Sequence, residues 1–224
     1  MKKPFVIAID GASSTGKSTL AKALAQALEF VYVDSGAMYR GVTLYAQQKQ
    51  WLSTNHFDKD MLIANLDDIQ LTFKHNKLML NGTDVSAAIR SMTVSNAVSQ
   101  VAAVSAVRSF LVAQQRAIGT QHSVVMDGRD IGTVVFPHAD VKLFLTADAN
   151  IRAQRRYDEL KAVDPSVTLY AILENITQRD HLDSTRSDSP LLQATDAIAI
   201  NASDFGISEL LGYVLELVKK RMGV

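Results

Sequence analysis

The sequence predicts an α/β fold, and three observations support this prediction. Short, nearly continuous apolar runs recur along the chain, as expected for buried parallel strands. Helical patterns lie between them, so that strand, loop and helix alternate as in a βαβ unit. The runs that begin at Phe5 and Ser123 both end in an aspartate. We therefore expect a parallel sheet that carries polar groups at the carboxyl ends of its strands.

The N-terminal part of the chain alternates regularly. Residues 5–10 form the first predicted strand, and residues 18–28 carry apolar side chains at helical spacing. A second strand is expected over residues 30–33 and a second helix over residues 37–50. This order is the βαβ signature of an α/β fold.

The pattern changes after Trp51. Residues 53–61 are polar and irregular, whereas residues 69–73 alternate with the period of a strand. Turn signals at His75-Asn76 and Asn81-Gly82 flank another short apolar run. We expect a small antiparallel meander inserted into the α/β body.

The rest of the chain is predicted to be helical between three further strands. The expected strands are residues 123–127, 141–145 and 196–200. The expected helices are a short segment ending near Arg90, one long helix over 95–118, one after an Asp148 N-cap, one over 170–183, and a last helix with Ile207, Leu210, Leu211, Val214, Leu217 and Val218 on its core face.

Composition narrows the possible functions. The chain has 224 residues, with 23 basic and 23 acidic side chains and no cysteine. A net charge of zero argues against general binding of nucleic acids or anionic membranes, and the lack of cysteine excludes disulfides and thiolate metal sites. No signal-peptide pattern follows Met1. We expect a cytoplasmic protein with no nucleic-acid or membrane partner.

A phosphate-binding loop follows the first strand. Residues 11–18 fit the pattern G-x-x-x-x-G-K-[ST], in which Gly11 and Gly16 let backbone N–H groups converge on an anion. Lys17 is expected to contact the β- and γ-phosphates of a nucleoside triphosphate, and Ser18 to bind Mg²⁺. A glycine-rich turn without function is the weaker alternative, because the predicted strand and helix lie where the motif requires them.

Two other predicted strand ends carry candidate site residues. Ser35, Tyr39 and Arg40 follow the second strand, where an ordinary N-cap and a solvated arginine are an equally good interpretation. In the segment from Asp127 to Asp130, Asp127 can hold Mg²⁺ through water, and Arg129 suits bidentate contact with a phosphate. A structural Asp–Arg pair is the alternative there.

The later arginines form two further groups. Arg152, Arg155 and Arg156 share a helix face, and the neighbouring Asp158 and Glu159 cannot pair with all three. Such a group is usually a basic helix face exposed to solvent. Because the acids cannot neutralise all three arginines, we favour the hypothesis of a helix that closes over ATP.

Arg179, Asp183 and Arg186 repeat at intervals of four and three residues, so they can project together from a helix end. An ordinary ion pair is the alternative. His181 is expected to be a surface residue.

These features favour a small P-loop kinase. The chain lacks the N-K-x-D guanine motif of GTPases. An acceptor phosphate is already largely ionised near neutral pH, with a second pKa of about 6, so its site needs arginines more than a base. The arginines therefore point to a nucleoside monophosphate kinase. Another small-molecule P-loop kinase and a nucleotide-dependent switch remain the alternatives.

The chain resembles the bacterial cytidylate kinase family over nearly its full length. The matching segments are residues 11–19, 34–40, 81–82, 84–86, 89–90, 98–103, 107–108, 127–130, 132–137 and 179–180 together with Asp183 and Arg186. The resemblance implies a five-stranded parallel sheet flanked by helices, a small antiparallel nucleotide-binding insert and a short helical lid. It also implies a single kinase domain with a core of 1–61 and 101–224, an insert of 62–100 and a lid of about 149–166.

The resemblance further implies the roles of particular residues. ATP would be bound by Gly11, Ala12, Ser13, Ser14, Thr15, Gly16, Lys17, Ser18, Thr19, Arg155 and Arg156. The acceptor would be bound by Ser35, Tyr39, Arg40, Ser99, Arg108, Arg129, Asp130, Arg179 and Asp183, with Ser99, Arg108 and Asp130 on the cytosine. Phosphoryl transfer would depend on Lys17, Arg129, Arg156, Arg179 and Arg186, and Mg²⁺ on Ser18 and Asp127.

The implied reaction transfers a phosphoryl group from ATP to CMP or dCMP with Mg²⁺, and the family favours a monomer. Two positions depart from the family pattern. Ala12 stands where many members have proline, and Leu182 stands where some have a further arginine.

Overall fold

The computed structural model describes residues 3–74, 76–162 and 164–223. His75, in the first expected turn, and Val163, in the expected lid, lie outside the described residues. The chain forms two compact units, which we call unit 1 (Met1–Tyr32 and Gly119–Val224) and unit 2 (Val33–Ile118). The expected insert of residues 62–100 lies within unit 2, and the expected lid lies within unit 1.

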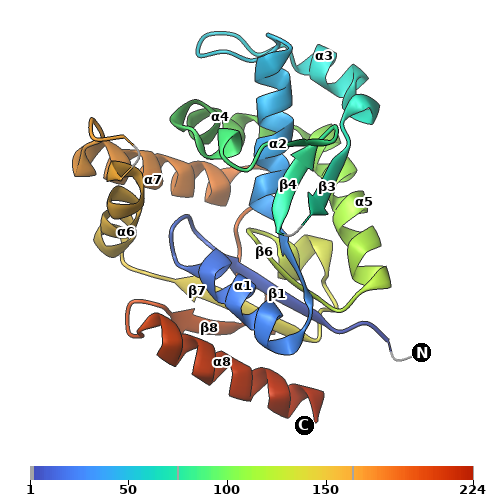
Figure 1. The fold of residues 1–224 in the computed structure, drawn as a ribbon, viewed down its shortest axis with the longest axis vertical. Coiled ribbons are helices and arrows are strands. Elements are labelled where there is room, and N and C mark those ends of the chain that lie inside the picture. Colours follow the sequence, from blue (N-terminus) through green and yellow to red (C-terminus); the bar gives the residue numbers. More distant parts are fainter. Residues whose placement is uncertain (1–2, 75, 163, 224) are drawn as a thin grey trace. The chain divides into compact units, whose positions relative to one another are not determined.

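A five-stranded sheet confirms the predicted α/β class (Figure 1). Its strand order is β2-β6-β1-β7-β8, and the strands are β1 (Val6–Gly11), β2 (Val31–Asp34), β6 (Val124–Gly128), β7 (Val141–Thr146) and β8 (Ile198–Asn201). β1 pairs in parallel with β6 and β7, and β7 with β8. The parallel register places the carboxyl ends of β1, β6 and β7 at one edge of the sheet.

Two helices, α1 (Lys17–Leu28) and α8 (Ile207–Met222), share the main core of unit 1 with the sheet. Leu24 and Val214 are fully buried there against strand side chains such as Ile9. The prediction that Ile207 faces the core is wrong, because this side chain is 71% exposed. Ile207 is the first residue of α8, so it lies ahead of the turns that reach the sheet.

The helices α6 (Ala149–Lys161) and α7 (Leu169–Thr185) lie side by side in unit 1 (Figure 1). They bury a separate small core of Ala153, Ile172 and Ile176. The side chain of Asp148 accepts hydrogen bonds from the backbone of Asn150 and Ile151, which confirms it as the N-cap of α6.

Unit 2 contains the predicted antiparallel meander. Its strands are β3 (Leu71–Lys74), β4 (Lys77–Leu80) and β5 (Thr83–Asp84), and its helices are α2 (Ser35–Gln48), α3 (Lys59–Ala64), α4 (Met92–Ala102) and most of α5 (Ser105–Gln121). Asp34 is the N-cap of α2, since its carboxylate accepts a hydrogen bond from Ala37 N at 2.8 Å. Helix α3 begins within the segment predicted to be irregular. It is too short to show a period, and Leu62 is the residue it buries.

The prediction of one helix over 95–118 is wrong. Helices α4 and α5 are separate and bent by 97°. No glycine or proline marks the break at Ala103 and Val104, which is why the apolar pattern suggested continuity. The bend keeps Val101, Val104 and Val107 all buried.

Within the described residues, no single helix has the length and apolar character to cross a membrane. The bent pair α4–α5 meets that test only when its two helices are taken together, by length and composition alone.

Candidate functional site

The P-loop has the backbone geometry that anion binding requires. Gly11 ends β1, and a Cβ there would collide with the carbonyl oxygen of Leu145. Gly16 has a φ of 91° and is the N-cap of α1, without a side chain that bonds the first turn. The first turn of α1 thus has no side-chain cap, and its N–H groups and the positive end of the helix favour a phosphate there.

Lys17 is buried and lies back along this loop. Its Nζ donates to Ala12 O at 2.7 Å, and Thr15 Oγ1 donates to the same carbonyl at 3.1 Å. The ammonium group is thus held beside the loop that is expected to bind a triphosphate.

Arginines from α6 and α7 contact the P-loop within unit 1. Arg152 Nη1 donates to Ser13 O at 3.2 Å, Arg155 Nη1 to Thr15 O at 3.4 Å, and Arg179 Nη1 to Ser13 Oγ at 3.3 Å. The structure therefore brings Arg155, expected to bind ATP, and Arg179, expected to bind the acceptor, to the loop.

The three arginines of α6 differ in their partners. Arg152 is buried and pairs with Asp180 of α7 at 2.6 Å. The sequence did not predict this pair, because only the acidic residues of the same helix entered the prediction. Arg156 pairs with the exposed Glu159 at 3.0 Å, within its own helix. Of the three, Arg152 thus joins α6 to α7.

Arg179 is the most electrostatically perturbed cation of this group. Burial and the repulsion from Arg129 and Arg156 together lower its pKa to about 10, against the attraction of Asp183. Its Nε is also buried without a hydrogen-bond partner among the described residues. A desolvated guanidinium near other cations, with a spare donor, is suited to an anionic ligand.

Four charged residues form a second cluster in unit 1. Arg129 Nε donates to Asp183 Oδ2 at 2.8 Å, while Arg186 lies 3.8 Å from Asp130 and 4.0 Å from Asp183. Burial acts to raise the pKa of Asp183, but the attraction of Arg129 outweighs it and the pKa is lowered. An ion pair between Asp183 and Arg179 of the same helix was the alternative interpretation. In the structure Asp183 instead pairs with Arg129, from the loop after β6.

The two residues expected to bind Mg²⁺ lie in contact. Ser18 Oγ donates to Asp127 Oδ2 at 2.7 Å, and Tyr32 OH donates to Asp127 Oδ1 at 3.0 Å. A hydroxyl and one carboxylate suit Mg²⁺, which keeps several waters and also binds substrate phosphates. Within the described ranges, no group of three His, Cys, Asp or Glu side chains could hold a metal alone.

Asp10 is a buried residue of this region that sequence analysis did not single out as a ligand. Its two carboxylate oxygens each accept a backbone N–H, from Ile131 and from Gly132, both at 2.7 Å. Burial raises its pKa to about 6, although these hydrogen bonds and Lys17 oppose the rise. The sequence feature that could have pointed to Asp10 is its position at the carboxyl end of the first predicted strand.

Unit 2 carries the other expected acceptor residues. Arg40 Nη1 donates to Ser95 Oγ at 2.9 Å and to Ile89 O at 3.2 Å, so a buried serine orients it. The guanidinium of Arg108 lies 5.6 Å from the centre of the Tyr39 ring. Ser35 is buried in the first turn of α2, and Ser99 is half-buried in α4.

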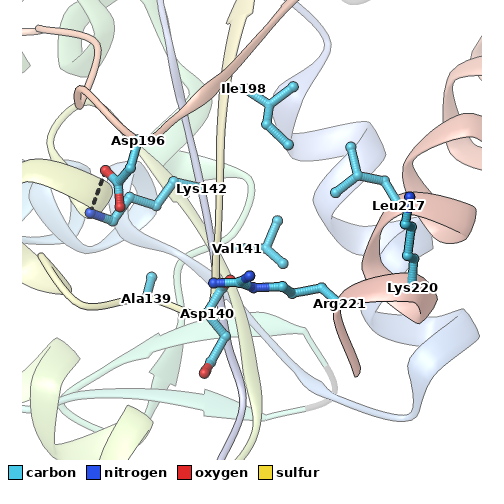
Figure 2. Close-up of a pocket in the computed structure, with 9 residues that line it drawn as sticks. All are labelled: Ala139, Asp140, Val141, Lys142, Asp196, Ile198, Leu217, Lys220 and Arg221. Carbon is cyan, nitrogen blue, oxygen red and sulfur yellow. Dashed lines mark hydrogen bonds and ion pairs between the residues drawn. The ribbon is translucent and has the colours of Figure 1, made fainter. Parts of the chain in front are cut away.

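A pocket of about 450 Å³ lies elsewhere in unit 1. Its lining includes Val141 and Ile198, the first residues of β7 and β8, so it lies at the sheet edge opposite the P-loop. Lys142 and Asp196 form an ion pair of 2.8 Å in it, and Arg221 extends from α8 (Figure 2).

Comparisons with known proteins show the family of the chain. The profile of the cytidylate kinase family matches residues 7–220. A cytidylate kinase of Flavobacterium johnsoniae is 53% identical, with 96% of each chain covered, and that of Flavobacterium psychrophilum is 50% identical, with 96% of this chain and 98% of the relative covered. An uncharacterized protein from Eubacterium ventriosum shares the fold, with a TM-score of 0.56 at 12% identity over 97% of this chain and 99% of its own. The chain belongs to the cytidylate kinase family.

Proposed function

We propose that the protein transfers the γ-phosphoryl group of ATP to CMP or dCMP, giving ADP and CDP or dCDP. The observation that carries the proposal is Arg179, a desolvated cation with a spare donor beside the P-loop. Its surroundings favour the dense negative charge of two nucleotides about to exchange a phosphoryl group. The relatives with the highest identity above are named cytidylate kinases, which supports cytidine nucleotides as acceptors.

In this reaction an oxygen of the acceptor phosphate forms a bond to the γ-phosphorus. The bond from that phosphorus to the β–γ bridging oxygen breaks, and ADP leaves with the bridging oxygen. No base is required, because the acceptor phosphate has a second pKa of about 6 and is mostly ionised near neutral pH. The protein supplies position and positive charge, with Lys17, Arg129, Arg156, Arg179 and Arg186 near the phosphates.

Unit 1 would bind ATP through residues 11–19 and through Arg155 and Arg156. Ser18 and Asp127 would hold Mg²⁺, the latter through water, and the metal would neutralise phosphate charge when bound. Arg129, Asp130, Arg179 and Asp183 of the same unit would contact the acceptor. Unit 2 would contribute Ser35, Tyr39, Arg40, Ser99 and Arg108, with Ser99, Arg108 and Asp130 on the cytosine.

ADP release in a coupled assay tests the proposal. CMP or dCMP added with ATP and Mg²⁺ should start rapid ADP release, whereas AMP or shikimate should not. A nucleotide switch would hydrolyse ATP slowly whatever the acceptor. Release that needs AMP or shikimate, with none on adding CMP, would exclude cytidylate kinase activity.

We further propose that the protein acts on free nucleotides as a cytoplasmic monomer, without a nucleic-acid or membrane partner. Its balanced charge argues against a nucleic-acid or anionic-membrane partner, and the resemblance to the family favours a monomer. A dimer in sedimentation equilibrium would refute the monomer.

A further inference from the structure

Asp10 joins the strand before the P-loop to the segment after Arg129 and Asp130. Its side chain is 4% exposed. Oδ1 accepts a hydrogen bond from Ile131 N and Oδ2 from Gly132 N, each at 2.7 Å. Both distances are short, as expected for hydrogen bonds to an ionised acceptor.

These hydrogen bonds fix the backbone on one side of Asp130. The carbonyl oxygen of Asp130, which belongs to the same peptide group as Ile131 N, accepts from Val134 N at 2.9 Å and from Val135 N at 3.2 Å. The peptide group that follows Asp130 is therefore held at both of its polar atoms, by Asp10 and by the adjoining helical turn. The direction of the Asp130 side chain depends on both, and Arg129 is the residue directly before it.

Space around the carboxylate is limited. A Cβ on Gly132 would lie 3.2 Å from Lys142 Cδ and 3.3 Å from Asp10 Oδ2. Lys142 is itself held by Pro137 O at 2.7 Å and by Asp196 at 2.8 Å (Figure 2). Because Lys142 and Asp10 are both held by hydrogen bonds, a methyl group added at Gly132 would crowd the Asp10 carboxylate.

Two charged groups face Asp10. Asp130 repels its negative charge, and Lys17 attracts it. Near neutral pH the carboxylate is ionised, and both of its oxygens accept. An asparagine has the same shape but one acceptor oxygen, so it would turn an NH₂ group towards one of the two N–H donors.

We propose that Asp10 is a positioning residue for the acceptor, which holds Arg129 and Asp130 in the orientation that binds the acceptor nucleotide. The proposal rests on the proposed function, because it takes Arg129 and Asp130 to contact the acceptor. Asp10 itself touches neither nucleotide in this role.

The first test compares Asp10→Asn with a matched control, Asp140→Asn. Asp140 Oδ2 accepts a hydrogen bond from Val6 N at 2.8 Å, so it makes the same kind of contact at the opposite end of β1. We expect Asp10→Asn to lower kcat/KM for CMP about tenfold, the usual effect of losing a group that orients a ligand-binding residue. KM for ATP should stay close to the wild-type value, and Asp140→Asn should change neither constant.

A second variant disturbs the contact between Asp10 and Gly132 by changing Gly132 instead of Asp10. Gly132→Ala keeps the Asp10 carboxylate but crowds both Oδ2 and Lys142. It should lower kcat/KM for CMP in the same selective way, and the double variant should lose less than the product of the two single losses. If Asp10→Asn fails to fold, Gly132→Ala alone decides the question.

The outcomes separate the inference from the proposed function. Wild-type enzyme that does not use CMP refutes the function. Wild-type enzyme that uses CMP, with variants that impair ATP and CMP equally or only lower the melting temperature, refutes the role of Asp10. A selective loss with CMP in both single variants supports it.

Discussion

Replacing Asp10 by asparagine should change how the stability of the protein depends on pH. Burial raises the pKa of this carboxyl from 3.8 to about 6. Between these two values the folded protein binds the proton more tightly than the unfolded chain does. The contribution of Asp10 to stability is therefore complete below about pH 4 and is lost as the pH rises through about 6.

The size of the effect follows from the shift. Two pKa units correspond to about 3 kcal/mol, since each unit is worth about 1.4 kcal/mol. The side chain is 4% exposed, so solvent screening reduces this figure little. The asparagine that replaces Asp10 does not titrate. The unfolding free energy of the variant minus that of the wild type should therefore rise by up to about 3 kcal/mol between about pH 4 and pH 7.

Urea unfolding followed by circular dichroism, at several pH values across this window, measures the effect. The quantity to follow is the difference in unfolding free energy between variant and wild type, because the other titrating groups largely cancel in it. Asp140→Asn, which replaces a carboxylate at the opposite end of β1, serves as the control. A difference that stays constant with pH for Asp10→Asn would contradict the assignment of a raised pKa to this residue.

Two other contacts give separate predictions. Asp183→Asn leaves Arg129 without its 2.8 Å partner, so we expect a loss of about 3 kcal/mol of stability in urea unfolding; a loss below about 1 kcal/mol would show that solvent already screens this pair. Tyr32→Phe removes the 3.0 Å hydrogen bond to Asp127, and we expect a loss of about 1 kcal/mol together with a higher Mg²⁺ requirement in the ADP assay; an unchanged Mg²⁺ titration would separate Tyr32 from the metal site.

The sheet and the P-loop could be predicted because their signals are local. A buried parallel strand is a short apolar run, and the P-loop needs particular residues at fixed spacing. The N-cap at Asp148 was also readable, since the helix that it caps begins directly after it. These features need no knowledge of distant parts of the chain.

The features that could not be predicted depend on distant partners. The bend between α4 and α5 has no breaker residue, and it is set by burial on both sides of Val104. The pair of Arg152 with Asp180 spans two helices, so spacing within one helix gave no indication of it. Asp10 likewise bonds residues more than a hundred positions away.

The perturbed pKa of Arg179 has a thermodynamic consequence for the whole of unit 1. Guanidinium groups that repel one another oppose the docking of α7, and a polyanion that neutralises them removes this opposition. Folding and nucleotide binding are therefore linked, so that the stability gained on adding a triphosphate includes the relief of this repulsion. Repulsion among the arginines destabilises the unliganded protein, and the relief of this repulsion contributes to the free energy of nucleotide binding.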